Sequence, residues 1–372
     1  MSASLSQAKS KTKPLNQTKS LSEQGKFKQS HHLVFGAGLI GCYLGGALIR
    51  AQQHVSLLGR PRFLEQLEKQ YVLSDYKGRR FNVQPSPRLV TNSEFSQVEQ
   101  IDVLWLTVKC TMLQDAITDL QTHSLGPKTL IICCQNGVGT HEIIKKAFPH
   151  NKVIRAMVPF NVVNDEPGCF HRGSQGRMVL EVTPELESFT KWLASQLNSD
   201  ILPVNISYDM TALQWAKLQL NLSNAVNALA DIPVKQMLET PVYRKFIARL
   251  MQELLLVTEK QKIKLPKIAN LPNKWIPKVL KLPNVPFKVL AQKMLAIDPA
   301  VKLSMWWDLQ NNKPTEVDYI NGKVVSQAQK LDISAPANQW IVSLIHEAQS
   351  GKRLSANAFK DAVMQFEKEQ DT

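Results

Sequence analysis

A lysine and several asparagines stand in the otherwise apolar segment 215–229, which has the pattern of a buried helix. Lys217 and Asn221 are four residues apart and share a face, and Asn224 continues that stripe. Buried polar groups cost free energy unless they are hydrogen-bonded or line a cleft. A lysine placed there can donate a proton to a carbonyl that is being reduced. The segment alone equally allows a lysine that extends to solvent and asparagines that bridge helices.

A second chemical signal is the run 34–41, in which an apolar stretch leads into Gly-x-Gly-x-x-Gly and a helical pattern follows. This strand–turn–helix order is typical of dinucleotide binding. Gly36 permits the sharp turn, Gly38 lets the backbone approach a pyrophosphate, and Gly41 lets the helix pack close to the strand. The phosphates would lie at the N-terminus of that helix. The expected cofactor-binding residues of the turn are Gly36, Ala37, Gly38, Leu39, Ile40 and Gly41.

The next expected strand, residues 54–58, indicates which nucleotide is bound. Enzymes that use NAD carry Asp or Glu near the end of this strand for the ribose 2′-hydroxyl. Here Arg60 and Arg62 follow the strand, and no acidic residue occurs before Glu65. A guanidinium can bind a 2′-phosphate bidentately, whereas a carboxylate would repel it. We therefore expect NADP(H) as the cofactor, with Arg60 as the first candidate and one of the two arginines as a solvated loop residue.

Further polar clusters follow strand ends or precede helices. Asn136 belongs to a Gln-Asn-Gly turn after an expected strand, and loops at the carboxyl ends of parallel strands are where ligands bind. Ser304 opens Ser-Met-Trp-Trp-Asp, and Glu316 stands at a position compatible with a helix start. His141 has no nucleophile to pair with, so we interpret it as a structural or surface residue.

The elements that position these residues alternate between strand-like and helical patterns up to about residue 205, and helical patterns dominate after about residue 208. This indicates an α/β fold, with an N-terminal Rossmann-type, doubly wound parallel sheet followed by an all-α C-terminal domain. The active site would lie in the cleft between the domains. The expected strands are residues 33–35, 55–58, 103–108, 130–134, 153–156 and 178–182, with a hairpin over 71–83. The expected domains are a basic disordered tail (1–30), an NADP-binding domain (31–207) and a helical substrate domain (208–365) with a Lys- and Pro-rich insert (261–302).

The net charge of +14 raises the question of a nucleic-acid partner. Residues 1–30 hold six Lys and one Glu, residues 261–302 hold nine Lys and one Asp, and the rest of the chain is nearly neutral. Neither segment has the motif of a known nucleic-acid-binding module. We therefore interpret the basic segments as solvated surface that attracts an anionic cofactor, and we expect no nucleic-acid partner.

The composition also indicates whether the protein binds a metal, enters a membrane or is secreted. The five cysteines form no C-x-x-C pair and have no histidines at zinc spacing, so we expect reduced thiols and no metal site. No apolar run is long enough to span a bilayer, and the N-terminus lacks the apolar core of a secretory signal. We expect a cytoplasmic enzyme that acts on a small molecule, as a monomer or a homodimer.

Together these motifs resemble the ketopantoate reductase family, the 2-dehydropantoate 2-reductases, over roughly residues 32–350. The resemblance rests on the glycine turn, Lys109 after a strand, the Gln-Asn-Gly turn, W-x-K-L-x-x-N and S-M-x-x-D. Its most specific part is T-E-V-D-Y-I-N-G at residues 315–322. The family binds NADPH on a Rossmann domain and reduces a 2-oxo acid in the cleft with a helical domain. The resemblance implies this activity here, as a step in pantothenate biosynthesis.

The resemblance also implies roles for individual residues. Lys217 would be the general acid that protonates the nascent alkoxide. Glu316 would hold the terminal hydroxyl of the substrate and help to place Lys217, and Asn136 would lie between the nicotinamide and the substrate or Lys217. Ser304 would bind the substrate carboxylate and Asn221 the substrate hydroxyl. The implied substrate contacts are Asn136, Asn221, Asn224 and Ser304, and the implied cofactor contacts outside the glycine turn are Arg60, Lys109, Asn136 and Glu316.

The chain departs from the family at two pocket positions. Well-studied members carry a second Asn eight residues after the Lys, where this chain has Ala225, and Asn224 is the expected substitute. Val301 stands where several members have Asn. Both changes preserve the reaction class and leave the identity of the 2-oxo acid open. The alternatives are a paralogous reductase of another small 2-oxo acid and a non-catalytic NADP(H)-sensing or nucleic-acid-associated protein; the presence of Lys217 and Glu316 favours an enzyme.

Overall fold

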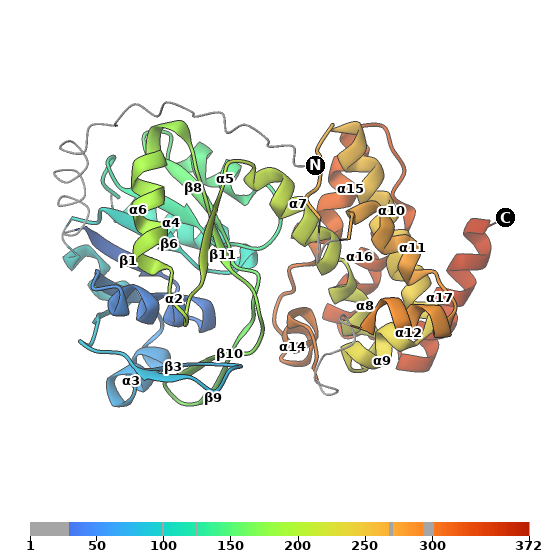
Figure 1. Ribbon diagram of the computed structural model, residues 1–372, viewed down its shortest axis with the longest axis horizontal. Coiled ribbons are helices and arrows are strands. Elements are labelled where there is room, and N and C mark those ends of the chain that lie inside the picture. The colour runs from blue at the N-terminus through green and yellow to red at the C-terminus, as the bar shows by residue number, and fades with distance from the viewer. Residues whose placement is uncertain (1–29, 99, 124, 268–270, 293–300, 372) are drawn as a thin grey trace, which may run out of the picture.

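The computed structural model has two lobes, one built on two sheets and one made of helices (Figure 1). Helix α7 (Met210–Asn221) leads from the first lobe into the second. This confirms the predicted fold class, an N-terminal α/β domain followed by a helical region. The structure describes the chain from Ser30 onward except for residues 99, 124, 268–270, 293–300 and 372. The expected basic tail, apart from its last residue, lies outside the described residues.

The larger sheet carries the glycine turn and the strand ends expected to bind ligands. Its strands are β1 (His31–Phe35), β2 (His54–Leu58), β5 (Arg88–Val90), β6 (Val103–Leu106), β7 (Leu130–Cys133), β8 (Val153–Met157), β11 (Met178–Glu181) and β12 (Val204–Ser207). Their order is β12-β11-β8-β7-β6-β1-β2-β5, with β1 in the middle. β6 and β7 are buried along their whole length, which is why each forms a continuous apolar run in the sequence.

One pair of strands in this sheet is antiparallel. The pairings from β5 through β8 are parallel, but β11 runs antiparallel to β8. Two further strands, β9 (Val162–Glu166) and β10 (Cys169–Arg172), occupy the connection between them instead of a crossover helix. A parallel strand requires such a crossover, so β11 returns in the opposite direction. The sequence predicts six of the eight strands but neither edge strand, β5 or β12.

Helices cover both faces of the larger sheet. They are α2 (Leu39–Arg50), α3 (Pro61–Lys69), η1 (Asn92–Gln97), η2 (Cys110–Met112), α4 (Leu113–Thr122), α5 (Thr140–Ala147), η3 (Pro184–Leu186) and α6 (Glu187–Leu197). Neighbouring strand residues point to opposite faces, so Val34 joins the core with α2 and α6 while Leu33 and Phe35 join the core with α4 and α5.

A smaller sheet of four strands lies beside the larger one, in the order β4-β3-β10-β9. β3 (Val72–Asp75) and β4 (Arg80–Asn82) pair antiparallel, which confirms the hairpin predicted over 71–83. Gly78 has a φ of +77° in its turn. β10 pairs parallel with β3 and antiparallel with β9.

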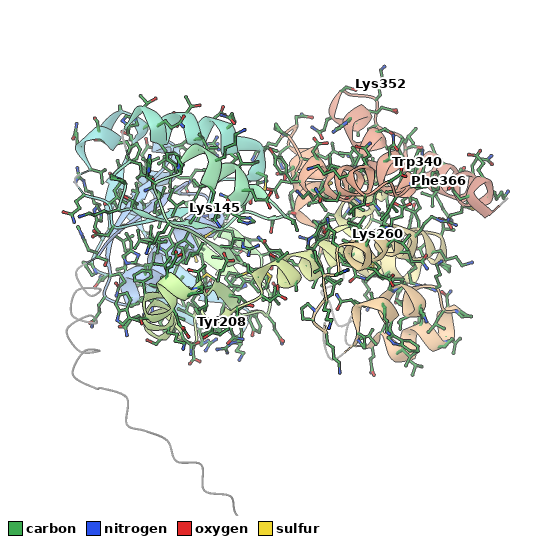
Figure 2. All side chains as sticks on the ribbon, turned by 90° about the horizontal axis from the view of Figure 1, so that it is seen from above. Lys145, Tyr208, Lys260, Trp340, Lys352 and Phe366 are labelled. Carbon is green, nitrogen blue, oxygen red and sulfur yellow. The ribbon has the colours of Figure 1, made fainter. Side chains whose placement is uncertain are left out.

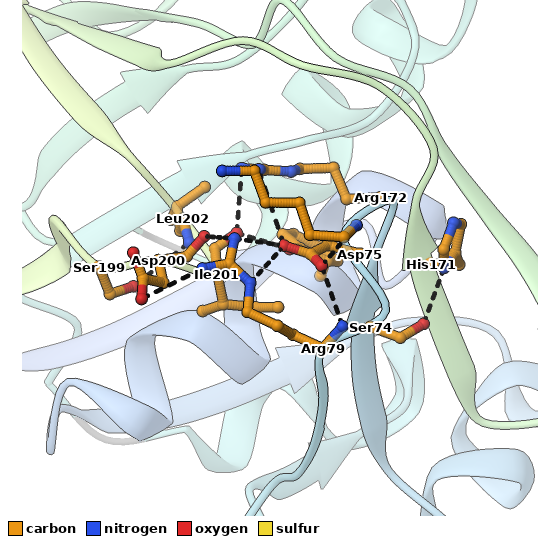
Figure 3. Close-up of polar contacts among 11 residues, drawn as sticks. Ser74, Asp75, Arg79, His171, Arg172, Ser199, Asp200, Ile201 and Leu202 are labelled. Atoms are coloured by element: carbon orange, nitrogen blue, oxygen red, sulfur yellow. Dashed lines mark hydrogen bonds and ion pairs between the residues drawn. The ribbon is translucent and has the colours of Figure 1, made fainter.

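A buried ion cluster around Asp75 ties the smaller sheet to the rest of the lobe (Figure 3). The Asp75 carboxylate accepts from the backbone N–H groups of Lys77 (3.0 Å) and Arg79 (3.2 Å) and from Arg79 Nε (2.9 Å). Arg172 Nη2 lies 4.0 Å from the same carboxylate, and Arg172 Nη1 donates to the Ile201 carbonyl oxygen (3.1 Å). Burial raises the pKa of Asp75, but the hydrogen bonds outweigh it and hold the net pKa below its usual value. The carboxylate is therefore charged at neutral pH.

The helical lobe is arranged around its longest central helix, α10. The elements after α7 are α8 (Ser223–Ala230), α9 (Val234–Glu239), α10 (Pro241–Lys260), η4 (Asn273–Trp275), α11 (Ile276–Leu280), α12 (Asn284–Leu290), α14 (Ser304–Gln310), η5 (Val317–Tyr319), α15 (Asn321–Lys330), α16 (Pro336–Gln349) and α17 (Ala356–Asp371). Trp340 and Phe366 stack with ring centroids 4.6 Å apart (Figure 2), and both meet Phe246 edge to face. None of the described helices is both long enough and apolar enough to cross a membrane.

The segment 215–229 forms two helices rather than the single helix that its pattern predicts. α7 ends at Asn221 and α8 begins at Ser223, with Leu222 between them in right-handed helical conformation. Ser223 Oγ donates to the Leu220 carbonyl oxygen (2.9 Å) at this junction. The interruption is a single residue, because the Leu222 N–H still donates to the Leu218 carbonyl oxygen (3.1 Å) as in a continuous helix.

The described part of the insert 261–302 contains the short helical turns that its prolines predict, η4, α11 and α12. Its lysines are exposed on these turns, at positions 274, 278, 281 and 288. These four lysines therefore place positive charge on the surface of the helical lobe.

Candidate active site

The glycine-rich turn has the conformation that its spacing predicts. Gly36 has a φ of +108°, and a Cβ there would lie 2.8 Å from Val108 Cγ1, so only glycine fits. A Cβ on Gly41 would collide with the Gly36 carbonyl oxygen. Apart from its chain neighbours and its own helix, no described residue comes within 4 Å of the Cβ position at Gly38, and the first bond of α2 runs from Cys42 N to Gly38 O (2.8 Å). The first N–H groups of α2 lack intrahelical acceptors and border this open side, which fits a pyrophosphate.

Arg60 lies beside the glycine turn. It follows β2, whose last residue, Leu58, accepts a hydrogen bond from Ala37 N (2.8 Å). Gly59 packs so closely on Ala37 that a Cβ would lie 2.5 Å from the alanine methyl group. Arg60 is exposed and precedes α3, and Arg62 in the first turn of α3 is exposed as well. The position of Arg60 therefore allows it to reach a nucleotide bound on the turn.

The Lys217 ammonium group has two protein acceptors, both at the ends of strands of the larger sheet. Nζ donates to Asn136 Oδ1 (2.7 Å), after β7, and to the Val158 carbonyl oxygen (2.5 Å), after β8. Burial lowers the pKa of Lys217 from 10.5 to about 8, although the negative charge of Glu316 raises it. Lys217 therefore faces the α/β lobe rather than extending to bulk solvent.

Glu316 joins the same network from the other side of Asn136. Glu316 is 7% exposed, and its carboxylate accepts from the backbone N–H of Cys110 (3.0 Å) and, over a longer distance, from Asn136 Nδ2 (3.4 Å). Lysine only donates and a carboxylate only accepts, so the Asn136 amide is oriented with its oxygen toward Lys217 and its nitrogen toward Glu316. Three predicted site residues, distant in sequence, thus form one chain of polar contacts.

The turn after β7 fits closely against the segment that carries Glu316. Gly137 has a φ of +86°, and a Cβ there would lie 2.7 Å from the Tyr319 carbonyl oxygen. The α/β lobe and the helical lobe are therefore in backbone contact beside the Asn136–Glu316 pair.

A small cavity lies between the two lobes next to Lys217. Asn221 lines it from one turn further along α7, as the i, i+4 spacing predicts. The lining residues are Gln135, Asn136, Gly137, Met157, Gln214, Lys217, Leu218 and Asn221. The cavity is thus formed by strand ends on one side and by α7 on the other, which is the predicted cleft.

Three predicted residues are placed elsewhere. Asn224 is buried on α8, about one helical turn beyond Asn221, and is not among the cavity-lining residues. Ser304 is exposed at the first residue of α14 and does not line the cavity either. Lys109 follows β6, but its ammonium is paired with Asp308 of α14 at 2.5 and 2.7 Å.

Sequence reasoning missed some groups of the site. The Val158 carbonyl oxygen and the Cys110 N–H are backbone groups, which leave no signal in residue type. Asp308 lies within the S-M-x-x-D motif, but its pairing with Lys109 joins residues 199 positions apart. Gln214 lines the cavity three residues before Lys217, and the helical spacing used for Asn221 also points to it.

No group of three or more His, Cys, Asp or Glu side chains that could hold a metal ion occurs in the part of the chain that the structure describes. A glycine turn that fits a pyrophosphate, together with an oriented lysine at a cavity beside the same sheet, is typical of an oxidoreductase of the nicotinamide-nucleotide type. Two family models match the chain: "Ketopantoate reductase PanE/ApbA" over residues 32–185 and "Ketopantoate reductase PanE/ApbA C terminal" over residues 209–349. The chain belongs to the ketopantoate reductase family.

Individual relatives agree with this assignment at low identity. A 2-dehydropantoate 2-reductase of Pyrococcus abyssi is 25% identical over 325 residues, which cover 86% of this chain and 99% of the relative. One from Streptococcus pyogenes serotype M3 is 22% identical over 329 residues, covering 85% and 97%.

Solved structures share the fold. A PanE/ApbA family ketopantoate reductase from Ralstonia eutropha matches 87% of this chain and 100% of its own, with 25% identity and a TM-score of 0.72. A D-mandelate dehydrogenase solved with NADH and anilino(oxo)acetate matches 87% and 100%, with 21% identity and a TM-score of 0.70. The fold therefore occurs in proteins named for different 2-oxo or 2-hydroxy acids.

Proposed function

We propose that this protein reduces 2-dehydropantoate to pantoate with NADPH. The observation that carries the proposal is the Lys217 ammonium, held by Asn136 and Val158 at a cavity between the lobes. Bound NADPH would supply a hydride to the 2-oxo carbon. Lys217 then gives a proton from Nζ to the carbonyl oxygen, so that an N–H bond breaks, an O–H bond forms and a neutral amine remains. Its positive charge also stabilises the negative charge that develops on that oxygen.

We also propose roles for the other site residues from their contacts with Lys217 and the cavity. Asn136 orients Lys217, and Glu316 keeps Asn136 in that orientation while its charge keeps the lysine protonated. Asn221 lines the cavity and donates to a substrate hydroxyl. Ser304 and Asn224 remain proposed substrate contacts. Since neither lines the cavity as it stands, both require the lobes to move around the substrate.

The proposed cofactor is NADP(H), bound by residues 31–207, while residues 208–365 form most of the substrate side. The turn 36–41 fits the pyrophosphate, and Arg60 beside it offers a guanidinium for a 2′-phosphate. Lys109 would join Arg60 at that phosphate only after its ammonium leaves Asp308. Burial raises the pKa of Asp308 despite the pairing with Lys109.

The test is the loss of absorbance at 340 nm with NADPH and 2-dehydropantoate, run beside NADH and a panel of other small 2-oxo acids. Turnover that is fastest with NADPH and 2-dehydropantoate supports the proposal. NADPH binding without turnover of any 2-oxo acid would contradict the proposed reaction.

Reduction of another small 2-oxo acid is the second candidate. Ala225 is fully buried and does not line the cavity, so no asparagine reaches the substrate from the position where the family resemblance implies one. A D-mandelate dehydrogenase of the same fold was solved with anilino(oxo)acetate, which supports keeping other 2-oxo acids as candidates. Faster turnover of a different acid in the same panel would favour this candidate.

Replacement of Arg60 by alanine is expected to raise the KM for NADPH about 10- to 100-fold, because the lost hydrogen bonds to a charged phosphate contribute ~1.5–3 kcal/mol. The KM for NADH, which lacks the 2′-phosphate, should stay within about twofold. Arg62→Ala is the matched control, because Arg62 is exposed two residues later in α3. An equal rise in the KM for NADPH and for NADH would show that Arg60 does not bind the 2′-phosphate.

The reduction rate is expected to fall as pH rises above about 8. Burial lowers the pKa of Lys217 to about 8, and only the protonated form can donate, so activity is present below that pKa and lost above it. Glu316→Gln removes a negative charge that raises the pKa of Lys217, so the alkaline limb of kcat/KM should move to lower pH. If the alkaline limb of kcat/KM is unchanged in Glu316→Gln, then Glu316 does not raise the pKa of Lys217.

A further inference from the structure

Arg155 on β8 is a buried arginine that connects the α/β lobe to α7. It is 7% exposed, and it binds Glu181 of β11 through Nε (2.9 Å), the backbone N–H (2.9 Å) and Nη2. Burial raises the pKa of Glu181, but the hydrogen bonds and charge of Arg155 outweigh it, so the carboxylate stays charged. His141, beside this pair, has its pKa lowered to about 4 by burial and then by Arg155, so it is neutral at pH 7. Glu181 therefore holds the Arg155 guanidinium in a fixed orientation.

The other terminal nitrogen of Arg155, Nη1, contacts side chains in the first turns of α7. Arg155 Nη1 donates to Thr211 Oγ1 (3.0 Å) and to the Gln214 side chain (3.0 Å). A guanidinium has no acceptor, so the atom of Gln214 that faces it must be the amide oxygen. The orientation of the Gln214 amide is therefore set by the chemistry of its partner, and Nε2 with its two hydrogens points away from Arg155.

Gln214 lies at the cavity next to Lys217. It is 5% exposed and is among the residues that line the cavity, and the three-residue spacing places it one turn before Lys217 on the same face of α7. Among the described residues, no protein acceptor within hydrogen-bond distance takes the hydrogens of Gln214 Nε2. A nearly buried donor without a protein partner costs free energy unless a ligand or water accepts from it.

We propose that Gln214 binds the substrate and helps to select it, with Arg155 as the positioning residue that orients its amide. Nε2 donates to an oxygen of the substrate carboxylate, on the side of the cavity where Lys217 donates to the 2-oxo oxygen. Both donors favour a 2-oxo acid, whose two functional groups present acceptors on neighbouring carbons. This inference rests on the proposed function, because it assigns a contact to that substrate.

The first test is Gln214→Leu, assayed with the 2-oxo acid that the wild type reduces best. The KM for the acid should rise about 10- to 100-fold, the range for losing a hydrogen bond to a charged group, while kcat falls less and NADPH affinity, measured by its fluorescence, stays within twofold. Thr211→Val is the matched control, because it removes the neighbouring contact of Arg155 but leaves the amide donor in place. Its KM should stay within about twofold of the wild-type value.

Gln214→Glu is a second variant that keeps the pairing with Arg155 and therefore the local fold. It replaces the donor by a carboxylate oxygen, so the KM for the acid should rise at least as much as in Gln214→Leu. An unchanged KM in both variants overturns the proposal. A loss of NADPH affinity with an unchanged KM for the acid also overturns it, because the donor then serves the nicotinamide. A wild type that reduces no 2-oxo acid would instead remove the proposed function on which this inference rests.

The positioning role of Arg155 is tested by a double-mutant cycle. Arg155→Lys frees the Gln214 amide to rotate and should raise the KM for the acid several-fold. The same change in the Gln214→Leu background should have no further effect on KM, because there is no amide left to orient. An effect of equal size in both backgrounds would show that Arg155 acts only on the fold.

Discussion

Lys217→Ala is expected to lower kcat for reduction of the 2-oxo acid by about 10²- to 10⁴-fold, the range for loss of a positioned general acid. Alanine removes both the proton that neutralises the developing alkoxide and the positive charge that stabilises it. NADPH affinity should change little, because the glycine turn and Arg60 lie at other strand ends. Steady-state kinetics at 340 nm and NADPH fluorescence titration measure the two effects separately.

Lys323→Ala is the matched control for this prediction. Lys323 is also a partly buried lysine whose pKa is lowered by burial, and it lies against the turn after β7 at Gly139, yet it does not line the cavity. Its replacement should leave kcat within about threefold of the wild-type value. A Lys217→Ala enzyme that keeps more than a tenth of the activity would show that another group, or water, donates the proton.

The site depends on amide orientation as much as on charge. Asn136 faces a pure donor, Lys217, on one side and a pure acceptor, Glu316, on the other, so its amide cannot flip without losing both contacts. The same logic fixes Gln214 against Arg155. Two residues whose amides are oriented by charged partners therefore lie at one cavity. The positions of these hydrogen-bond donors and acceptors are set before any ligand binds.

Local patterns are sufficient to predict part of this arrangement. The spacing of Gly36, Gly38 and Gly41 reflects steric requirements within one strand–turn–helix unit, and each requirement is visible in the structure. Lys217 is recognisable because a lysine in an apolar helix requires a polar environment or a route to solvent. Asn221 follows from helical spacing alone.

Contacts between distant segments could not be predicted from the residues themselves. The Lys217–Asn136 and Asn136–Glu316 contacts span 81 and 180 positions, and only the family resemblance indicated that they share a site. Asn224 continues the polar stripe of Lys217 and Asn221 in the sequence, but the residue pattern does not show that the cavity ends at Asn221. The antiparallel β11 follows from a connection whose strands are short and partly exposed.

Asp75→Asn is expected to lower the free energy of unfolding by about 3–5 kcal/mol, the cost of removing one partner from a buried ion pair. Asp75 and Arg172 are both 1% exposed, and without the carboxylate charge the Arg172 guanidinium keeps, among the described residues, the Ile201 carbonyl oxygen and the ring faces of Tyr76 and Phe160. Urea denaturation followed by circular dichroism measures the change, provided that the transition stays two-state.

Asp165→Asn is the control for this change, because Asp165 also lies in the smaller sheet, 3.8 Å from the His171 ring, but its side chain is 57% exposed. Its effect should stay within about 0.5 kcal/mol, as for most surface positions. The pKa of Asp75 is lower in the folded protein than its usual value of 3.8, so its stabilisation is complete above that value and is lost as pH falls through the folded-state pKa. The difference between wild type and Asp75→Asn should therefore be constant from about pH 5 to 8 and shrink below about pH 4. A difference that persists undiminished in acid would assign the stabilisation to hydrogen bonds that the asparagine amide does not replace, rather than to the charge of Asp75.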